Sequence, residues 1–253
     1  MTPDAWIDRV IERHTASMTR PEFLKAVRAL SARYVEQRAA LRDRSPLDSA
    51  GKRAAFAGFY ALLHFLTVRQ IAESVGLGRW NVETVVDLGC GTGVGGAAWA
   101  LACPTPPRVA GVDLNTWALG EARWNLDALG LRARMKRGNL VAALDELVSR
   151  PQARTGVILG WSVNELSDPD RTRATDLILG LATRAIPVVV VEPIATRIVP
   201  WWPAFAGRVA NAGGRIDEWK FDAPLPPILA GLDEAAGFRR ESLSARSAVF
   251  GVS

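Results

Sequence analysis

The sequence predicts an α/β protein in which helices cover both faces of a mostly parallel sheet and a helical extension comes first. From Val82 onwards, short apolar runs alternate with helical patterns of about 10–15 residues, which is typical of βαβ units. A glycine-rich turn joins the first apolar run to the first helix of this series. Before residue 79, only helical periodicity occurs. We therefore expect two domains, a helical extension over residues 1–78 and an α/β domain over residues 79–253.

Composition indicates a water-soluble globular protein. The chain has 253 residues, of which 49% are hydrophobic, and a mean hydropathy of +0.08. No apolar run approaches the roughly 20 residues that span a bilayer, and the acidic Asp4, Asp8 and Glu12 do not suit a secretory signal. Cys90 and Cys103 are too few for a metal cluster and suggest no disulfide. We expect a cytoplasmic protein with no metal and no membrane partner.

Positive charge is concentrated in the first third of the chain. There are 31 Lys and Arg against 26 Asp and Glu, a net charge of +5. The first 80 residues contain 13 of these basic and 8 of these acidic residues, so the remainder is balanced. A basic extension suits an anionic partner such as RNA. The alternative is a helical surface with many solvated arginines.

Three helices are predicted in the extension. Thr19 and Glu22 have the spacing of a capping box, which opens the second helix. The third helix is apolar nearly all round, so we expect it to be buried, and Gly76 ends it. The predicted ranges are 3–16, 19–43 and 49–75.

Seven strands are predicted in all. The predicted strands are 82–88, 109–114, 131–136, 156–160, 188–192, 215–221 and 245–252, and the helices between them are 94–101, 116–129, 140–150 and 169–186. The fifth strand is continuously apolar, as expected of a central parallel strand. The last two strands alternate in the manner of antiparallel edge strands. Asp168 is the predicted N-cap of the last of these helices, with Pro169 at its first position.

The turn after the first predicted strand has the character of a nucleotide cradle. Asp87 precedes three glycines at alternate positions, Gly89, Gly91 and Gly93. Glycine allows a positive φ and a close approach of backbone to ligand. The following helix directs its free N–H groups and its positive dipole end at whatever lies over the turn. The spacing differs from the dinucleotide fingerprint G-x-G-x-x-G, which disfavours a nicotinamide nucleotide.

Asp87 and the three glycines resemble motif I of the class I S-adenosylmethionine (SAM) methyltransferases. The resemblance implies a seven-stranded Rossmann-like sheet with SAM as cofactor, and an acid that helps to hold its cationic methionine end. Asp113 ends the second strand and would accept the ribose hydroxyls, or cap the next helix. Asn139 would receive the adenine amino group through its amide oxygen, or cap the helix that follows it. The predicted cofactor-binding residues are Asp87, Gly89, Cys90, Gly91, Gly93, Asp113, Leu114, Asn139, Leu140 and Trp161.

The loop after the fourth strand would lie beside the transferred methyl group. Glu165 is a candidate to orient or deprotonate an amine or hydroxyl, and Asn164 to hold the acceptor by its amide. The alternative is that both residues cap the segment leading to the next helix. The loop lacks the Asn/Asp-Pro-Pro-aromatic tetrapeptide of amino-methylating nucleic-acid enzymes and the paired histidines of many small-molecule methyltransferases. Four further residues are candidates for an acceptor pocket, with core packing as the simpler interpretation: Tyr60, His64, Trp201 and Trp202.

Residues 85–195 also resemble a narrower group, the methyltransferase-like proteins associated with the small ribosomal subunit of bacteria and mitochondria. The shared features are the Asn-Glu-Leu triplet at 164–166, an arginine-containing helix after it, Val-Glu-Pro at 191–193 and a basic helical extension. The chain lacks the cysteine cluster of the mitochondrial members. The resemblance implies methyl transfer to RNA, most simply ribosomal RNA. Two alternatives stay open: a methyltransferase acting on a small molecule or peptide, and a non-catalytic SAM-binding ribosome assembly factor.

Overall fold

The computed structural model describes residues 1–36, 49–222 and 225–251, apart from the side chains of 33–36. The chain forms two compact units. One contains Met1–His64 and Phe221–Leu243, and the other contains Phe65–Lys220 and Ser244–Ser253. The division therefore falls earlier than the predicted boundary at residue 78, and a C-terminal segment joins the N-terminal helices.

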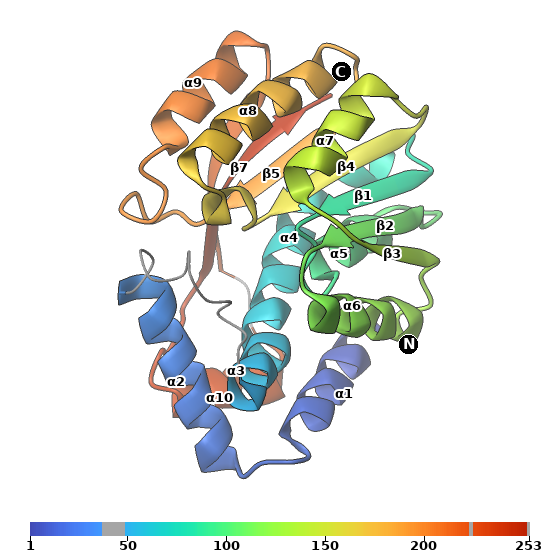
Figure 1. Cartoon of the computed structure of the whole chain (residues 1–253). Coiled ribbons are helices and arrows are strands. Elements are labelled where there is room, and N and C mark those ends of the chain that lie inside the picture. The colour runs from blue at the N-terminus through green and yellow to red at the C-terminus, as the bar shows by residue number, and fades with distance from the viewer. Residues whose placement is uncertain (37–48, 223–224, 252–253) are drawn as a thin grey trace. The chain divides into compact units, whose positions relative to one another are not determined.

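The first unit is helical. Its elements are α1 (Pro3–Thr15), α2 (Arg20–Glu36), α3 (Ala50–Ala55), the π-helical turn η2 (Phe56–Tyr60), the start of α4 (Ala61–Val75) and α10 (Pro227–Ala235) (Figure 1). The predicted capping box is present, because Glu22 Oε2 accepts a hydrogen bond from Thr19 N at 2.7 Å. The Phe59 and Phe238 rings lie 5.9 Å apart, which joins the C-terminal segment to the N-terminal helices. The predicted end of the second helix, near residue 43, lies outside the described residues.

A long apolar helical run connects the two units along the chain. Ala50–Val75, 26 residues, is long and apolar enough to cross a membrane by length and composition. Within the protein, 67% of its most apolar window is buried, as in the core helix of a folded domain. Gly76 follows with φ 77°, so the predicted glycine stop is confirmed.

The second unit is built on one seven-stranded sheet with the order β3-β2-β1-β4-β5-β7-β6. The strands are β1 (Thr84–Leu88), β2 (Arg108–Asp113), β3 (Ala133–Arg137), β4 (Thr155–Gly160), β5 (Val188–Glu192), β6 (Arg215–Phe221) and β7 (Leu243–Phe250). The first five are parallel, and β7 pairs antiparallel with β5. The predicted strand number and the antiparallel addition to a parallel sheet are confirmed. The predicted edge position is wrong for β7, which lies between β5 and β6, and holds for β6.

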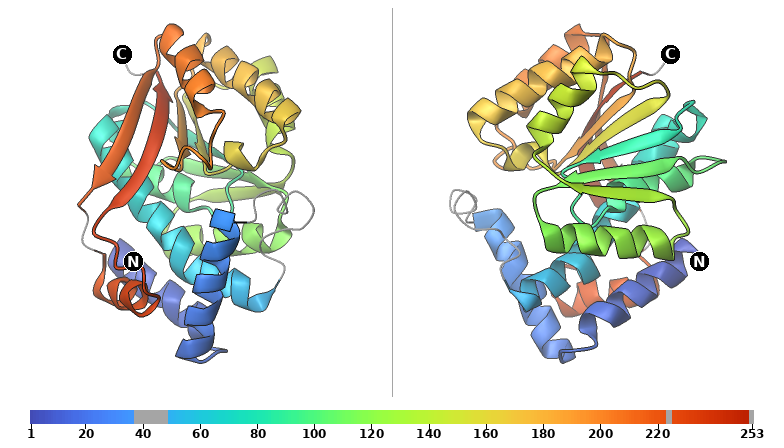
Figure 2. Two further views of the ribbon diagram at one scale, coloured as in Figure 1. Left: turned by 90° about the vertical axis from the view of Figure 1, so that its left-hand side faces the viewer. Right: turned by 45° about the vertical axis from the view of Figure 1, so that its right-hand side comes forward.

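Helices cover both faces of this sheet. On one face, α5 (Val94–Ala102) and α6 (Thr116–Ala128) pack against β1, β2 and β3, with the short η3 (Leu77–Arg79) beside α5. On the other face lie α7 (Leu140–Ser149), α8 (Asp168–Ala182) and α9 (Trp202–Asn211). The right-hand view of Figure 2 shows α7 and α8 on one side of the sheet and α6 on the other.

Strand alternation decides which β1 side chains meet which helices. Val86 and Leu88 belong to the apolar cluster beneath α7, α8 and α9. Asp87, between them, points to the opposite face and reaches α5. The parallel arrangement brings the carboxyl ends of β1 to β5 to one edge of the sheet, where ligands of doubly wound proteins bind.

The structure corrects the start of α8 and adds two helices. Ser167, not Asp168, is the N-cap, because its side chain accepts from Asp170 N at 3.3 Å. The helices α9 and α10 were not predicted. Both carry a proline in their first turn, Pro203 and Pro227, and proline marks a chain break as readily as a helix start.

Candidate active site

The glycine turn after β1 is a backbone cradle. Gly89, Gly91 and Gly93 have φ values of 69°, 51° and 78°, a region that residues with a Cβ rarely adopt. A Cβ on Gly89 would lie 2.5 Å from Ser162 Cβ, and one on Gly93 would lie 3.0 Å from Ala122 Cβ. Gly93 also precedes α5, whose first N–H groups face the turn. Conformation therefore requires glycine at all three positions, and space requires it at Gly89 and Gly93 as well.

Asp87 anchors the turn to α5. Its side chain is buried, with 2% of the residue exposed, and its Oδ2 accepts from Gly96 N at 2.8 Å. Burial raises the pKa of Asp87 to about 7, the Gly96 hydrogen bond lowers it, and the nearby Asp113 raises it. A cationic ligand over the turn would favour the ionised form of this carboxyl group.

Asp113, at the end of β2, connects the second strand to the same turn. Its Oδ2 accepts from Gly91 N at 2.8 Å, and its Oδ1 accepts from Asn115 N at 2.7 Å. The alternative that Asp113 caps α6 is wrong, because Asn115 caps it through hydrogen bonds from Trp117 N and Ala118 N. Leu114, beside this acid, is 62% exposed, which provides an apolar surface for a planar ring.

The Cys90 side chain is buried between the turn and β2, with its thiol 3.8 Å from Gly91 O. A Cβ on Gly111 of β2 would lie 2.9 Å from Cys90 Sγ, so this sulfur packs against the strand. Burial raises the pKa of the Cys90 thiol well above its usual range. The predicted contact of Cys90 with the cofactor stays a prediction. Thr92 Oγ1, in contrast, is buried in the turn without a hydrogen-bond partner among the described residues, as expected of a site that takes a polar ligand.

Asn139, Leu140 and Trp161 also lie at the carboxyl ends of strands. Asn139 Oδ1 accepts from Val141 N at 2.8 Å and Ala142 N at 3.1 Å, so this amide oxygen caps α7. Its predicted contact with adenine stays a prediction. Leu140 is buried, and its Cδ1 lies 3.3 Å from where a Gly89 Cβ would be. Trp161 follows β4 with φ 54°, held by its N–H to Val191 O at 2.8 Å.

The acceptor candidates lie in the short helix η4 (Val163–Glu165) after β4. Asn164 donates from its backbone N to Glu192 Oε1 at 3.1 Å and from Nδ2 to Glu192 Oε2 at 2.6 Å. Its Nδ2 also donates to Trp161 O at 3.0 Å. Both partners of Nδ2 only accept, so the orientation of this amide is fixed. Glu165, the other candidate, is exposed.

Glu192 is the site residue that sequence reasoning missed. It ends β5 with 0% exposure, 28 residues along the chain from its partner Asn164. The available signal was an acid at the carboxyl end of a central apolar strand, the place where doubly wound sheets bind ligands. The structure therefore joins the carboxyl ends of β4 and β5 through one carboxylate and one amide.

The predicted pocket residues Tyr60 and His64 belong to the helical unit. Tyr60 donates its hydroxyl to Val27 O at 3.0 Å, and burial raises its pKa. Burial lowers the pKa of His64 to about 3, so its imidazole is neutral, and its ring lies edge-on to Phe56 at 6.4 Å. Tyr60 thus has the alternative role, that of a packed residue with a satisfied polar tip.

The predicted pocket residues Trp201 and Trp202 lie at the start of α9 in the other unit. Trp202 is buried in the apolar cluster, with its ring 5.4 Å from Phe205. Trp201 packs against that cluster, and the Arg171 guanidinium lies 5.4 Å from its ring centre. The core interpretation therefore holds for Trp202. Among the described residues, no group of three or more His, Cys, Asp or Glu is placed to hold a metal ion.

Comparison with known proteins gives one family match and many structural ones. Residues 71–150, which include the glycine turn, β2, β3 and α7, match the family model described as methyltransferase small domain. No curated protein matches this chain at a significant level.

Three solved structures share the fold. An O-methyltransferase family protein from Burkholderia thailandensis is 17% identical, with a TM-score of 0.53 over 88% of this chain and 63% of its own. The mitomycin 7-O-methyltransferase is 15% identical, with a TM-score of 0.52 over 99% of this chain and 73% of its own. A SAM-dependent methyltransferase from Agrobacterium tumefaciens is 17% identical, with a TM-score of 0.53 over 75% and 62%. This chain thus spans less than two thirds of the first and third of these proteins.

The sheet order and the glycine cradle are those of the class I methyltransferase fold, and residues 71–150 match a methyltransferase family model. The match and the shared fold support a SAM-dependent methyltransferase, with S-adenosylmethionine as its cofactor. The residues present fit that cofactor: a backbone cradle, a buried acid for its cationic end, Asp113 for its ribose and the exposed Leu114 for its base. When bound, SAM supplies a methyl group activated by its sulfonium. The narrower resemblance to proteins of the small ribosomal subunit stays a prediction.

Proposed function

We propose that the protein transfers the methyl group of SAM to a nitrogen or oxygen atom of RNA. The observation that carries the proposal is the Asn164–Glu192 pair at the carboxyl ends of β4 and β5, the side of the sheet next to the glycine turn. Glu192 Oε2 and Trp161 O both accept from Asn164 Nδ2, which fixes the orientation of this amide and makes its carbonyl oxygen the group that suits an incoming acceptor. A carbonyl oxygen orients a group that carries hydrogen, such as an amine or a hydroxyl.

Methyl transfer from a sulfonium needs alignment of donor and acceptor and removal of one proton when the nucleophile carries it. Asn164 is suited to the alignment, because its geometry is fixed from both sides. Glu165, one residue further and exposed, is the carboxylate placed to take up the proton. Trp161, half-buried at the end of β4, would exclude water from the acceptor side of the site.

RNA as the acceptor is supported by charge. The net charge of +5 arises in the first third of the chain, and the α/β domain adds a basic surface of its own beside the glycine turn. Polyanions are attracted to such surfaces in a salt-dependent way.

A second candidate function is methyl transfer to a small molecule. It is favoured by the two structures named as O-methyltransferases, which match 88% and 99% of this chain. The half-buried Trp201 would then contribute to an aromatic acceptor pocket. In this case the basic surfaces would have no role in the reaction.

Transfer of radiolabelled methyl groups from SAM separates these functions. The purified protein is incubated with total bacterial RNA, with the same RNA after ribonuclease digestion, and with a low-mass cell extract. Label in nucleosides from intact RNA alone supports RNA methylation. Label in the low-mass extract alone supports the small-molecule function. No transfer by protein that binds SAM in calorimetry contradicts both and supports a non-catalytic assembly factor.

A further inference from the structure

A groove of about 620 Å³ lies on the sheet face that carries α7, over the β1, β2 and β3 side of the sheet. One wall is α7, and the floor is formed by strands β1 and β2. The floor and lower wall are apolar, formed by Val86, Ala110, Val112, Ala143 and Leu147. The groove thus has a long apolar floor at the surface of the unit that contains the sheet.

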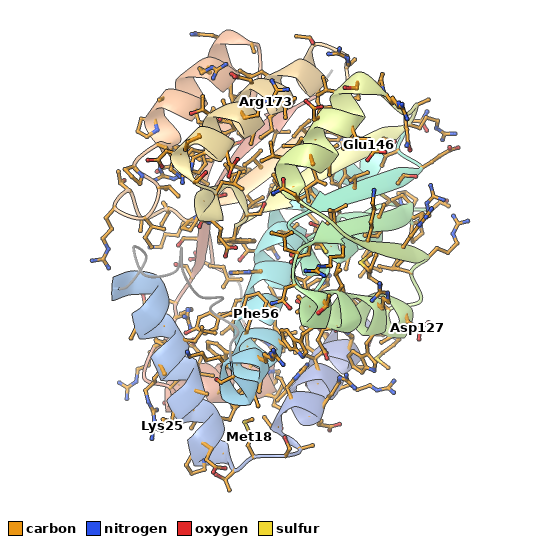
Figure 3. The ribbon with its side chains drawn as sticks, in the orientation of Figure 1. Met18, Lys25, Phe56, Asp127, Glu146 and Arg173 are labelled. Carbon is orange, nitrogen blue, oxygen red and sulfur yellow. The ribbon has the colours of Figure 1, made fainter. Side chains whose placement is uncertain are left out.

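The rim of the groove is basic. Arg134 and Lys136 stand two residues apart on β3, so strand alternation places both on the groove face. Arg108 begins β2, and Arg150 follows α7. The lining residues contain these four cations and one acid, Glu146, labelled on α7 in Figure 3.

The single carboxylate does not neutralise the rim. Glu146 Oε2 lies 3.7 Å from Lys136 Nζ, and their side chains are 64% and 67% exposed. An exposed pair of this kind contributes little binding energy and is screened by salt. Arg108 donates to Thr84 Oγ1 at 3.2 Å, which leaves its charge uncompensated by that contact.

One end of the groove reaches the cofactor turn. Gly138 and Asn139, which line that end, follow β3, and Gly138 N donates to Asp113 O at 3.0 Å. Asp113 in turn holds Gly91. The other end lies where β1 and β2 begin, at Thr84 and Arg108. The groove therefore runs along the strands, about 16 Å for five residues, and ends at the cofactor site.

We infer that this groove binds a single strand of RNA and leads it towards the cofactor side of the enzyme. The four basic side chains contact the phosphates, and the apolar floor receives sugars and base faces. Proteins that bind single strands without sequence preference combine a positive groove with aromatic surfaces on which bases stack, and in this groove aliphatic side chains form the apolar surface. The inference rests on the proposed function and gives its substrate a place to bind.

The test is a double substitution in the rim with a matched control elsewhere. Arg134→Ser with Lys136→Ser removes one arginine and one lysine from β3. The control, Arg184→Ser with Lys220→Ser, removes the same two residue types from exposed positions that do not line the groove. Both variants are first checked for an unchanged thermal midpoint and unchanged SAM affinity.

Binding is measured by fluorescence anisotropy with an oligouridylate of about 12 nucleotides, at salt concentrations from about 50 to 200 mM. Two lost phosphate contacts should reduce the affinity by about tenfold or more near 0.1 M salt and make the slope of log K against log salt shallower by about 1.4. The control should keep the affinity and the slope of the unsubstituted protein. An equal change in both variants, or no change in either, overturns the inference. Equal binding of an oligoglutamate through the same residues also overturns it.

Methyl transfer to RNA is assayed in parallel, so that the inference and the proposed function can fail separately. If RNA is labelled but the groove variant binds RNA as the unsubstituted protein does, the groove inference is wrong and the proposed function stands. If RNA binds through the groove but is never labelled, the groove inference stands and RNA is not the methyl acceptor. An unsubstituted protein that neither binds nor labels RNA rejects both.

Discussion

The two halves of the sheet build their parts of the active site in different ways. The cofactor half, β1 to β3, works mainly with backbone groups near in sequence: Gly96 N binds Asp87, nine residues away, and Asn139 caps the helix that it begins. The acceptor half, β4 and β5, relies on two side chains, Asn164 and Glu192, which are 28 residues apart. A backbone cradle depends on where glycine stands, whereas a side-chain pair depends on which strands become neighbours.

The two halves meet at Gly89. A Cβ there would lie 2.5 Å from Ser162 Cβ, and Ser162 Oγ donates to Leu88 O at 3.0 Å. Gly89→Ala should therefore have the largest effect, a loss of about 3 kcal/mol of unfolding free energy from strain and overpacking, with SAM binding lost. Denaturant unfolding and calorimetric titration with SAM measure the two effects.

Gly130→Ala is the control for backbone strain alone. Gly130 has φ 72°, but nothing lies within 4 Å of a Cβ built on it. We expect a loss of about 1 kcal/mol and unchanged SAM affinity. Equal losses of stability in the two variants would contradict a tight junction between the halves.

Asp87 tests the cofactor half by charge. Asp87→Ala removes the acceptor of Gly96 N and the predicted partner for the cationic end of SAM, so SAM affinity should fall by about tenfold to a hundredfold. Calorimetry of folded, cofactor-free protein measures this. An unchanged affinity would remove Asp87 from the site.

Asp87 also predicts a dependence of stability on pH. Burial raises the pKa of Asp87 from its ordinary value of 3.8 to about 7, so the folded state binds more protons than the unfolded state between these values. This contribution to stability is complete below about pH 4 and is lost as the pH rises towards 7. Asp87→Asn keeps an acceptor for Gly96 N without the buried charge. It should raise the thermal midpoint of the cofactor-free protein at pH 8 more than at pH 5.

Glu192 and Glu165 test the acceptor half. Glu192→Gln replaces one of the two acceptors for Asn164 by a donor, so turnover should fall by about tenfold while SAM affinity changes less than about twofold. Glu165→Ala should give the same pattern without loss of stability, because this residue is exposed. Steady-state kinetics and calorimetry separate the two quantities. Equal losses of SAM affinity and turnover would make either residue structural.

The smallest expected effects concern two helix caps. Asn139→Ala and Asn115→Ala each remove the side-chain acceptor for two backbone N–H groups, at the starts of α7 and α6. Each should lower the unfolding free energy by about 1 kcal/mol. Only Asn139→Ala should also weaken SAM binding if its predicted contact with adenine is made. Equal SAM affinities in the two variants would restrict Asn139 to capping.

The comparison of the two halves also explains how much of this molecule its sequence predicts. The seven strands, the glycine turn and the capping box follow from local patterns, because glycine, apolar periodicity and short polar side chains act within a few residues. The same local reasoning placed Asp113 at the end of β2. It failed at the start of α8, where two neighbouring residues are both suitable caps and Ser167, not Asp168, caps the helix.

Long-range relations were not predicted. The sequence shows an acid at the end of β5, but only the sheet order β4-β5 brings Glu192 to Asn164. The side-chain direction of Cys90 depends on Gly111 of the neighbouring strand, which leaves room for its sulfur. The unit boundary was missed for the same reason, because nothing local in Phe221–Leu243 indicates that it packs with helices some 160 residues earlier.

The path of Phe221–Leu243 has a consequence for how the chain is made. During synthesis the N-terminal helices emerge first, yet the segment that carries Phe238, the partner of Phe59, emerges almost last. The chain then returns to supply β7, which lies between β5 and β6. A premature stop after Lys220 would therefore release a product in which the helical unit lacks part of its core and β6 has no neighbour on which to form.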